Sequence, residues 1–253
     1  MKKLWIVLSV LWLWTCSESG PTEPKEPPIV VNLVSLSGQV QKGPFTNGTS
    51  ITISELENSL TPTGKNFNTN IQSNTGSFSV ENVQLISPYV EARASGFYFN
   101  EVTNQISSAQ LSLNALSNLQ GKTSININIL SHLEYLRIKN LISGNNPLSF
   151  TVAKNQALTE VLGIFDFSKS GVSDAELLDI TQSGDGNAKL LAISSIMLQD
   201  RTVGQFSELL ANISTDIASD GVLNNDSSFP FCFSACDIDR YRWLYRIHYV
   251  NIN

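Results

Sequence analysis

The spacing of apolar residues changes once along this 253-residue chain, and that change constrains the fold more than any other feature. From Leu36 to about Leu119, apolar residues alternate with polar ones in short runs bounded by Gly, Asn, Pro or Ser. Such alternation is typical of strands with one buried face. After Gly121, apolar residues recur every three to four positions, which is the period of an amphipathic helix. The sequence therefore predicts an α+β fold in which strands precede helices.

The alternating runs predict an antiparallel β-sandwich over residues 36–120, because short strands with frequent turns are typical of that architecture. The clearest runs are Thr49–Ile53, Phe67–Ile71, Phe78–Val80 and Val90–Ala94. Turn residues separate them at Lys42–Pro44, Asn47–Gly48, Thr61–Gly64 and Asn74–Gly76. One last alternating run consists of Ile125, Ile127 and Ile129.

A helical domain is predicted for residues 121–226. Capping boxes, in which a hydroxyl and a residue three positions later each bond the other's amide, are expected at Ser131–Glu134, Ser173–Glu176 and Thr202–Gln205. The third precedes an apolar stripe from Val203 to Ile217. Core packing is favoured over a membrane-surface role because the polar face of this stripe lacks Lys and Arg. Two further helices are expected, from Ser149 to about Ile164 and from Asn187 to about Gln199.

The N-terminus has the pattern of a secretory leader. Lys2 and Lys3 precede the apolar stretch Leu4–Trp14, so residues 1–15 are predicted to be a signal peptide. The stretch is too short for a transmembrane helix, which needs roughly 20 apolar residues. Residues 16–35 hold four prolines and are predicted to form an extended tether.

Residues 13–16, LWTC, resemble the lipobox of bacterial lipoproteins. This resemblance implies that Cys16 is the first mature residue and carries acyl chains that anchor the protein to a membrane. The alternative is an ordinary signal peptide with an incidental cysteine. The stretches SGQVQKGPFTNGTSITI and TGSFSVENV are similar to small prealbumin-like or carboxypeptidase-regulatory-like sandwiches. That likeness implies a structural or binding module and no particular activity.

The sequence contains the stretches QKGPFTNGTSITISELENSLTPTGKNF, HLEYLRIKNLI and GDGNAKLLAISSIMLQ. Through them, most of the mature chain up to about Asp226 resembles a group of secreted lipoproteins of Gram-negative bacteria, and the likeness implies no biochemical activity. The likeness implies a lipid-anchored protein of the cell envelope, expected at the outer membrane. The partners expected are membrane lipid, bound through the acyl chains, and an envelope protein or glycan. Nucleic acid is not expected as a partner because the formal net charge is −6.

The sequence predicts no catalytic residue, metal site or cofactor. His132 and His248 are the only histidines, and His132 is predicted to lie on a helix surface. Nucleophile-elbow, HExxH, phosphate-loop and dinucleotide-binding patterns do not occur in the sequence. A non-enzymatic binding or structural role is therefore expected. The alternative is an envelope enzyme, or accessory module, that acts on glycans or peptides.

Two short stretches suggest ligands. Asp216–Ser227 aligns with part of an EF-hand loop, but Ala218 and Ser227 replace calcium ligands, so a helix C-cap at Asp220 and Gly221 is favoured. The triplet Phe97–Phe99 could present Tyr98 as a sugar or peptide platform. The favoured interpretation places Phe97 and Phe99 in the core, with Tyr98 incidental.

The C-terminal residues differ in composition from the rest of the chain. Residues 227–253 are predicted to be an atypical, poorly packed tail. A disulfide between Cys232 and Cys236 is one alternative for this segment, and two free thiols are the other. The folded body has no other cysteine, so it must be stabilised by apolar burial.

Overall fold

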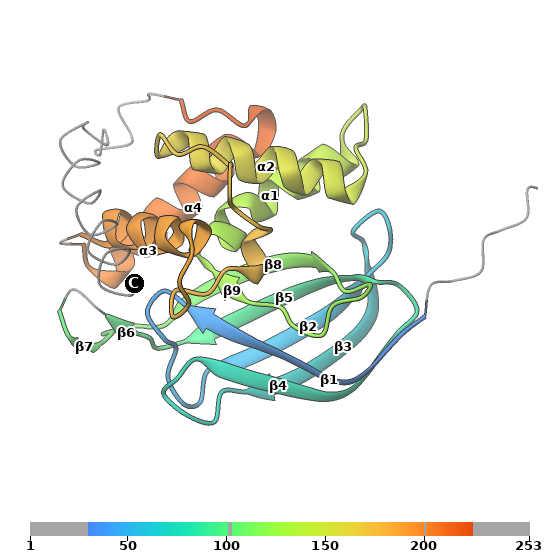
Figure 1. The fold of residues 1–253 in the computed structure, drawn as a ribbon, viewed down its shortest axis with the longest axis horizontal. Coiled ribbons are helices and arrows are strands. Elements are labelled where there is room, and N and C mark those ends of the chain that lie inside the picture. Colours follow the sequence, from blue (N-terminus) through green and yellow to red (C-terminus); the bar gives the residue numbers. More distant parts are fainter. Residues whose placement is uncertain (1–29, 101–102, 200, 225–253) are drawn as a thin grey trace, which may run out of the picture.

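The computed structural model describes residues 30–100, 103–199 and 201–224. The strands come first and the helices follow, so the α+β class is confirmed (Figure 1). Several predictions concern residues outside these ranges. They are the signal peptide at residues 1–15, the acylated Cys16, the tail from residue 227 with Cys232 and Cys236, and His248.

Two larger sheets and one small ribbon contain the strands. One sheet has the order β4-β1-β9, the other β3-β2-β5-β8, and the ribbon pairs β6 with β7. The strands are β1 Val31–Gln41, β2 Ser50–Leu56, β3 Pro62–Asn70, β4 Ser77–Leu85, β5 Tyr89–Gly96, β6 Phe99–Asn100, β7 Gln105–Ile106, β8 Leu111–Asn118 and β9 Ile127–Asn128. The first strand thus begins at residue 31, inside the segment that was predicted to be a tether.

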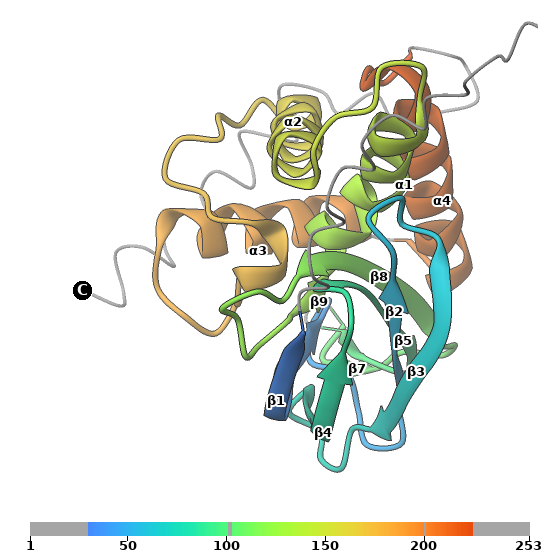
Figure 2. The same cartoon turned by 90° about the vertical axis from the view of Figure 1, so that its right-hand side faces the viewer.

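The helices follow the strands and lie together at one side of the sheets (Figures 1 and 2). They are α1 Ile129–Ser143, α2 Phe150–Ile164, the 3₁₀ turn η1 Ala175–Leu177, α3 Asp185–Leu198 and α4 Val203–Asp220. The predicted bounds of α2 and α3 are confirmed to within two residues. No helix in the described part of the chain is both long and apolar enough to cross a membrane.

Alternating burial explains why the predicted strands form. Ile51 and Ile53 of β2 and Ala92 and Ala94 of β5 are fully buried, whereas the residues between them face outward. At Gly38, β1 lies so close to the following segment that an added Cβ would be 1.9 Å from the carbonyl oxygen of Ile125. A glycine at this position therefore permits the backbone contact between β1 and residues 123–125.

Only one of the three predicted capping boxes is found as predicted. Thr202 caps α4, and its box with Gln205 is complete. The cap expected at Ser131 lies three residues earlier, because Asn128 caps α1 in a box with Ser131 as its third residue. The prediction of a cap at Ser173 is wrong, since that segment forms only the three-residue turn η1 and makes no side-chain cap bond.

Strands and helices share one hydrophobic core. The larger cluster of buried side chains includes Ile53 of β2, Val90 of β5, Leu133 of α1 and Phe206 of α4. A smaller cluster lies between the end of β2 and the helices α1 and α2. Helix α1 connects the two layers because it packs against β8, α2 and α4.

Candidate functional site

A buried lysine between two glutamates forms the most concentrated group of charges in the described residues. The Nζ atom of Lys154, on α2, donates to a carboxylate oxygen of Glu134 on α1 and, at 2.5 Å, to Oε2 of Glu176 in η1. It also donates to the carbonyl oxygen of Leu116 at 3.3 Å. Both carboxylate side chains are 0% exposed. The cluster thus joins α1, α2, η1 and β8.

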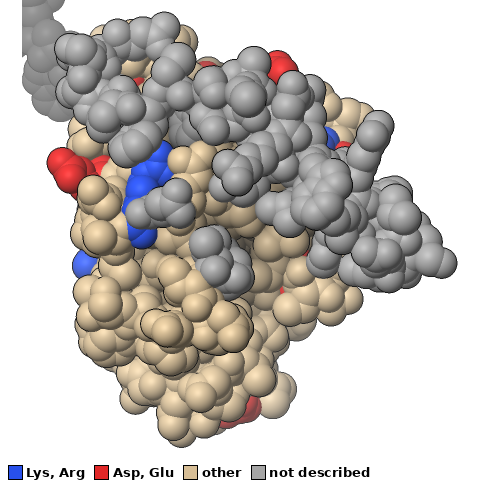
Figure 3. Space-filling model, turned by 90° about the vertical axis from the view of Figure 1, so that its left-hand side faces the viewer, with Lys and Arg blue, Asp and Glu red and all other residues tan. Residues whose placement is uncertain are grey.

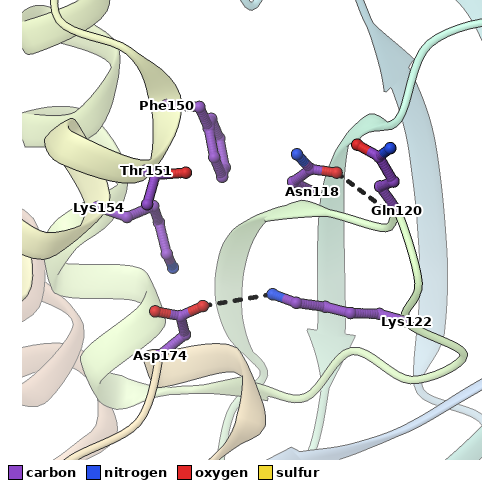
Figure 4. Close-up of a pocket in the computed structure, with 7 residues that line it drawn as sticks. All are labelled: Asn118, Gln120, Lys122, Phe150, Thr151, Lys154 and Asp174. Carbon is purple, nitrogen blue, oxygen red and sulfur yellow. Dashed lines mark hydrogen bonds and ion pairs between the residues drawn. The ribbon is translucent and has the colours of Figure 1, made fainter. Parts of the chain in front are cut away.

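A pocket of about 240 Å³ opens beside this cluster (Figure 4). Lys122 reaches across it and donates to Asp174 at 3.3 Å and to Glu176 at 3.2 Å. Phe150 and Thr151, from the start of α2, face Asn118 and Gln120 across the opening. Lys154 lies at the base of the pocket and is only 3% exposed.

Burial and the neighbouring charges shift the pKa values of this cluster in different directions. Burial raises the pKa of Glu134 to about 7, against the opposing effect of Lys154. Burial acts in the same sense on Glu176, but Lys154 and Lys122 outweigh it and lower the pKa of that carboxyl. The two carboxylates likewise outweigh the desolvation of Lys154 and raise its pKa. Lys154 is therefore a permanent cation.

The cations beside this pocket already have partners within the protein. Lys154 makes three hydrogen bonds, and Lys122 binds two carboxylates. Removing one member of a buried ion pair generally costs about 3–5 kcal/mol, because the remaining charge is left without a partner. The arrangement accordingly favours a structural link between helices and sheet over a site that a ligand could enter.

A second hollow lies on the outer face of the four-stranded sheet and has a volume of about 410 Å³. We call it the trough. Only polar side chains line it, and they are Ser50, Thr52, Ser54, Glu91, Arg93 and Ser95. These residues alternate with the buried apolar positions of β2 and β5, so the same alternation that builds the core also builds the trough.

Arg93 is the one cation that lines the trough. It is exposed and forms no hydrogen bond or ion pair with any residue that the structure describes. Glu91, two residues earlier on the same face, accepts through Oε2 from the hydroxyl of Tyr135 at 2.7 Å and from Lys139 at 3.5 Å. No described residue donates to its other oxygen, Oε1. A ligand could therefore bind to the guanidinium of Arg93 and to Oε1 of Glu91 without displacing a described partner of either group.

His132 lies near the trough, and its predicted position on a helix surface is wrong. Its ring is half-buried, and its Nδ1 atom accepts a hydrogen bond from the backbone amide of Asn114 at 3.2 Å. Burial, with a smaller effect of the Arg93 charge, lowers the pKa of His132 to about 4. The imidazole is therefore neutral at neutral pH and adds no charge beside Arg93.

Both interpretations of the triplet Phe97–Phe99 are wrong, because each expected Tyr98 to be the residue that faces outward. Tyr98 is fully buried and packs against Phe45, with 5.9 Å between ring centroids, whereas Phe97 is 39% exposed. Phe99 is half-buried. The amide of Tyr98 bonds to Ser107 Oγ, which fixes the chain as it leaves β5. No platform centred on Tyr98 exists in this structure.

The described part of the stretch that partly matched an EF-hand loop, residues 216–224, holds the last turn of α4 and the residues directly after it. Gly221 has the left-handed conformation, with φ of 78°, and its amide bonds to the carbonyl oxygen of Ile217. The carboxylate of Asp216 accepts from the backbone and side chain of Asn224. The favoured helix C-cap is thus confirmed. Within the described residues, no group of three or more His, Cys, Asp or Glu side chains is arranged to hold a metal ion.

Sequence reasoning missed both charge clusters. Glu91 and Arg93 occupy the polar positions of the run VEARA, so the alternation could have placed them together on one outward face. Glu134 and Lys154 gave no comparable signal, because charged residues within a helix are usually exposed. Most of the described surface in Figure 3 is uncharged, in keeping with the 15% of charged residues in the chain. On such a surface, Arg93 is distinctive because it lines a hollow and pairs with no residue that the structure describes.

The comparisons with known proteins provide no relative. No protein-family model matches the chain, and neither a curated protein nor a solved structure does.

Proposed function

We propose that this chain is a membrane-anchored lipoprotein of the bacterial cell envelope whose body binds a polar ligand without catalysis. Acylation of Cys16 would hold the body beside the membrane, expected to be the outer one. The two larger sheets would form the sandwich of a binding module. The observation that carries the binding role is the guanidinium of Arg93, which pairs with no described residue, in a trough lined only by polar side chains.

A trough of this kind suits ligand recognition better than stability. On a protein surface, charged side chains are usually paired or fully solvated. A cation in a hollow that pairs with no described residue does not stabilise the folded state. Hydroxyl groups and carboxylate oxygens are the groups that fix the orientation of a polar ligand. The trough is open, so a ligand could bind without movement of the core.

The alternative function is an envelope enzyme or accessory module that acts on glycans or peptides. One observation favours it: the pKa of Glu134, near 7, is in the range of a general acid. However, its side chain is 0% exposed and is bound to Lys154, so a substrate has no access to it. Binding is therefore the better-supported role.

Anchoring is tested by labelling cells with radioactive palmitate. The natural chain is expected to carry the label and to sediment with membranes. Cys16→Ser should lose the label and appear in the soluble fraction. Cys232→Ser is the matched control, since it removes a thiol that the proposal does not use. Label retained by Cys16→Ser would refute the anchor.

Binding is tested on an array of glycans and peptides with the soluble Cys16→Ser chain. A second substitution, Thr52→Trp, fills the floor of the trough and is expected to abolish binding. Gln84→Trp adds the same ring to an exposed position on β4 and should leave binding unchanged. If Thr52→Trp binds as well as its parent, or if nothing on the array is bound, the trough is not the binding site.

A further inference from the structure

The six residues of the trough lie on β2 and β5, and polar residues of β3 and β8 continue the same rows, so that four strands present a grid of hydrogen-bonding groups. Arg93 lies opposite Thr52 of β2 and Asn114 of β8, and Ser95 lies opposite Ser50 and Ser112. Strand β3 extends these rows with Asn68 and Asn70. Neighbouring strands are about 4.8 Å apart, so each row presents a polar group at that interval.

The two charges of the grid have a spacing that fits one sugar unit. Glu91 and Arg93 are two residues apart on the same face, which separates them by about 7 Å along the strand. A carboxylate oxygen such as Oε1 of Glu91 accepts hydrogen bonds from hydroxyls. A guanidinium binds a carboxylate through two parallel hydrogen bonds. Glu91 thus suits the hydroxyl groups of a ligand, and Arg93 suits its carboxylate.

Other ligand classes fit the trough less well. Peptides are held mainly through apolar and aromatic anchors, and no apolar or aromatic residue lines the trough to receive one. A phosphate-rich ligand would meet a single arginine with the carboxylate of Glu91 nearby, on a chain of net charge −6. A neutral glycan could accept hydrogen bonds from the guanidinium but would not neutralise its charge. A ligand rich in hydroxyls that also carries one carboxylate per unit offers an anion to Arg93 and hydroxyl donors to Glu91.

We infer that the trough recognises an acidic saccharide, with the sugar carboxylate on Arg93 and the sugar hydroxyls on Glu91 and the serine and threonine side chains around it. This inference rests on the proposed binding function and adds the class of ligand. The ligand is a glycan built from uronic acids or similar carboxylated sugars.

The test is calorimetry with an oligogalacturonate and with the same oligomer as its neutral methyl ester. The protein is the full chain carrying Cys16→Ser. The acid is expected to bind about 10- to 100-fold more tightly than the ester, since a hydrogen bond to a charged group is worth that factor. Arg93→Gln should weaken binding of the acid by the same factor and leave binding of the ester unchanged.

Lys65→Gln is the matched control, because it removes an exposed cation from β3, in the same sheet but outside the trough. It should bind the acid like its parent, and the thermal midpoints of both variants should show that they fold. Equal affinity for acid and ester, or an acid bound equally well by Arg93→Gln, would overturn the inference. So would an acidic peptide that binds in an Arg93-dependent way more tightly than the oligogalacturonate.

The two proposals fail in different ways. If the ester binds as tightly as the acid and Thr52→Trp abolishes both, the ligand is a neutral glycan and only the inference fails. If Thr52→Trp leaves the binding of every ligand unchanged, the trough itself is not a site and the proposed function fails with it.

Discussion

Two ionisable side chains on α1, one buried and one half-buried, have pKa shifts with opposite effects on stability. Glu134 has a pKa of about 7 in the folded protein and an ordinary value of 4.5. Between these values the folded state retains a proton that the unfolded state has lost, so the free energy of unfolding falls as pH rises. His132 has a pKa of about 4 instead of 6.5, so its contribution to stability is lost as pH falls through that window.

We therefore expect two variants to change the slope of the free energy of unfolding against pH in opposite directions. Glu134→Gln should make the free energy of unfolding rise more steeply between pH 4.5 and 6.5, because only the His132 effect remains. His132→Asn should make it fall more steeply with pH. Each change in slope is at most about 1.4 kcal/mol per pH unit. Urea unfolding of the soluble chain at pH 5 and pH 6.5 measures both.

The exposed carboxylate of Glu208 provides the control for the loss of a charge, through Glu208→Gln. Slopes that change in the same direction for Glu134→Gln and His132→Asn would contradict the pKa directions given above.

At the scale of residues, the sequence predicted burial of apolar side chains but not of charged ones. Glu134 and Lys154 are buried because their partners come from other elements, and no local pattern identifies such a partner. Arg93 could have been assigned to an outward face from the alternation in β5. The sequence could not predict that Arg93 pairs with no described residue, since that depends on which residues of β2 and β8 lie beside it.

Helix α4 ends at Gly221, in a conformation that other residues adopt at a cost. A Cβ atom there would lie 2.2 Å from the carboxyl carbon of Glu160, which holds Arg137 through bonds of 2.7 and 3.0 Å. Gly221→Ala should therefore destabilise the protein by about 1–2 kcal/mol. Gly204→Ala, in the first turn of the same helix, meets no neighbouring atom and should stabilise by about 0.5–1 kcal/mol.

Urea unfolding of both alanine variants tests this difference in one helix. Gly221→Ala with the stability of the natural chain would mean that neither the left-handed backbone nor the Glu160 contact constrains the helix end. A destabilised Gly204→Ala would show that alanine propensity does not govern the first turn.

At the scale of elements, local signals succeeded where tertiary contacts agree with them. The capping box at Thr202 and the glycine at the end of α4 were both identified, because each acts within one turn of helix. At Ser173 the signal failed because Glu176 binds Lys154 instead of reaching back to cap a helix. At Ser131 the hydroxyl is part of a box, but as the residue that follows Asn128 by three.

At the scale of the whole molecule, the order of strands in the sheets was beyond sequence reasoning. β1 pairs with β4 and with β9, and these pairings join residues that are far apart in the chain. The trough depends on the same long-range register between β2 and β5. Alternation predicts that a strand has a polar face, while only the pairing decides which polar faces meet.

The core that strands and helices share leads to a prediction about whether residues 36–120 and 121–226 unfold as one unit or as two domains. Leu133 of α1 is fully buried in the cluster that also holds Ile53 and Val90 of the sheet. Leu133→Ala should therefore lower the free energy of unfolding by about 2–5 kcal/mol. If strands and helices unfold together, the protected amides of β5 and α1 should lose the same amount of protection.

Native-state hydrogen exchange measures both sets of amides in one experiment. Val152→Ala on α2 is the control, because Val152 is 50% exposed and its truncation should cost little. Protection that falls in α1 but not in β5 would show that residues 36–120 and 121–226 are separate domains, as their different apolar periods predict. Equal losses would show instead that the strands need the helices to complete their core, so that the trough on β2 and β5 is held in shape by α1.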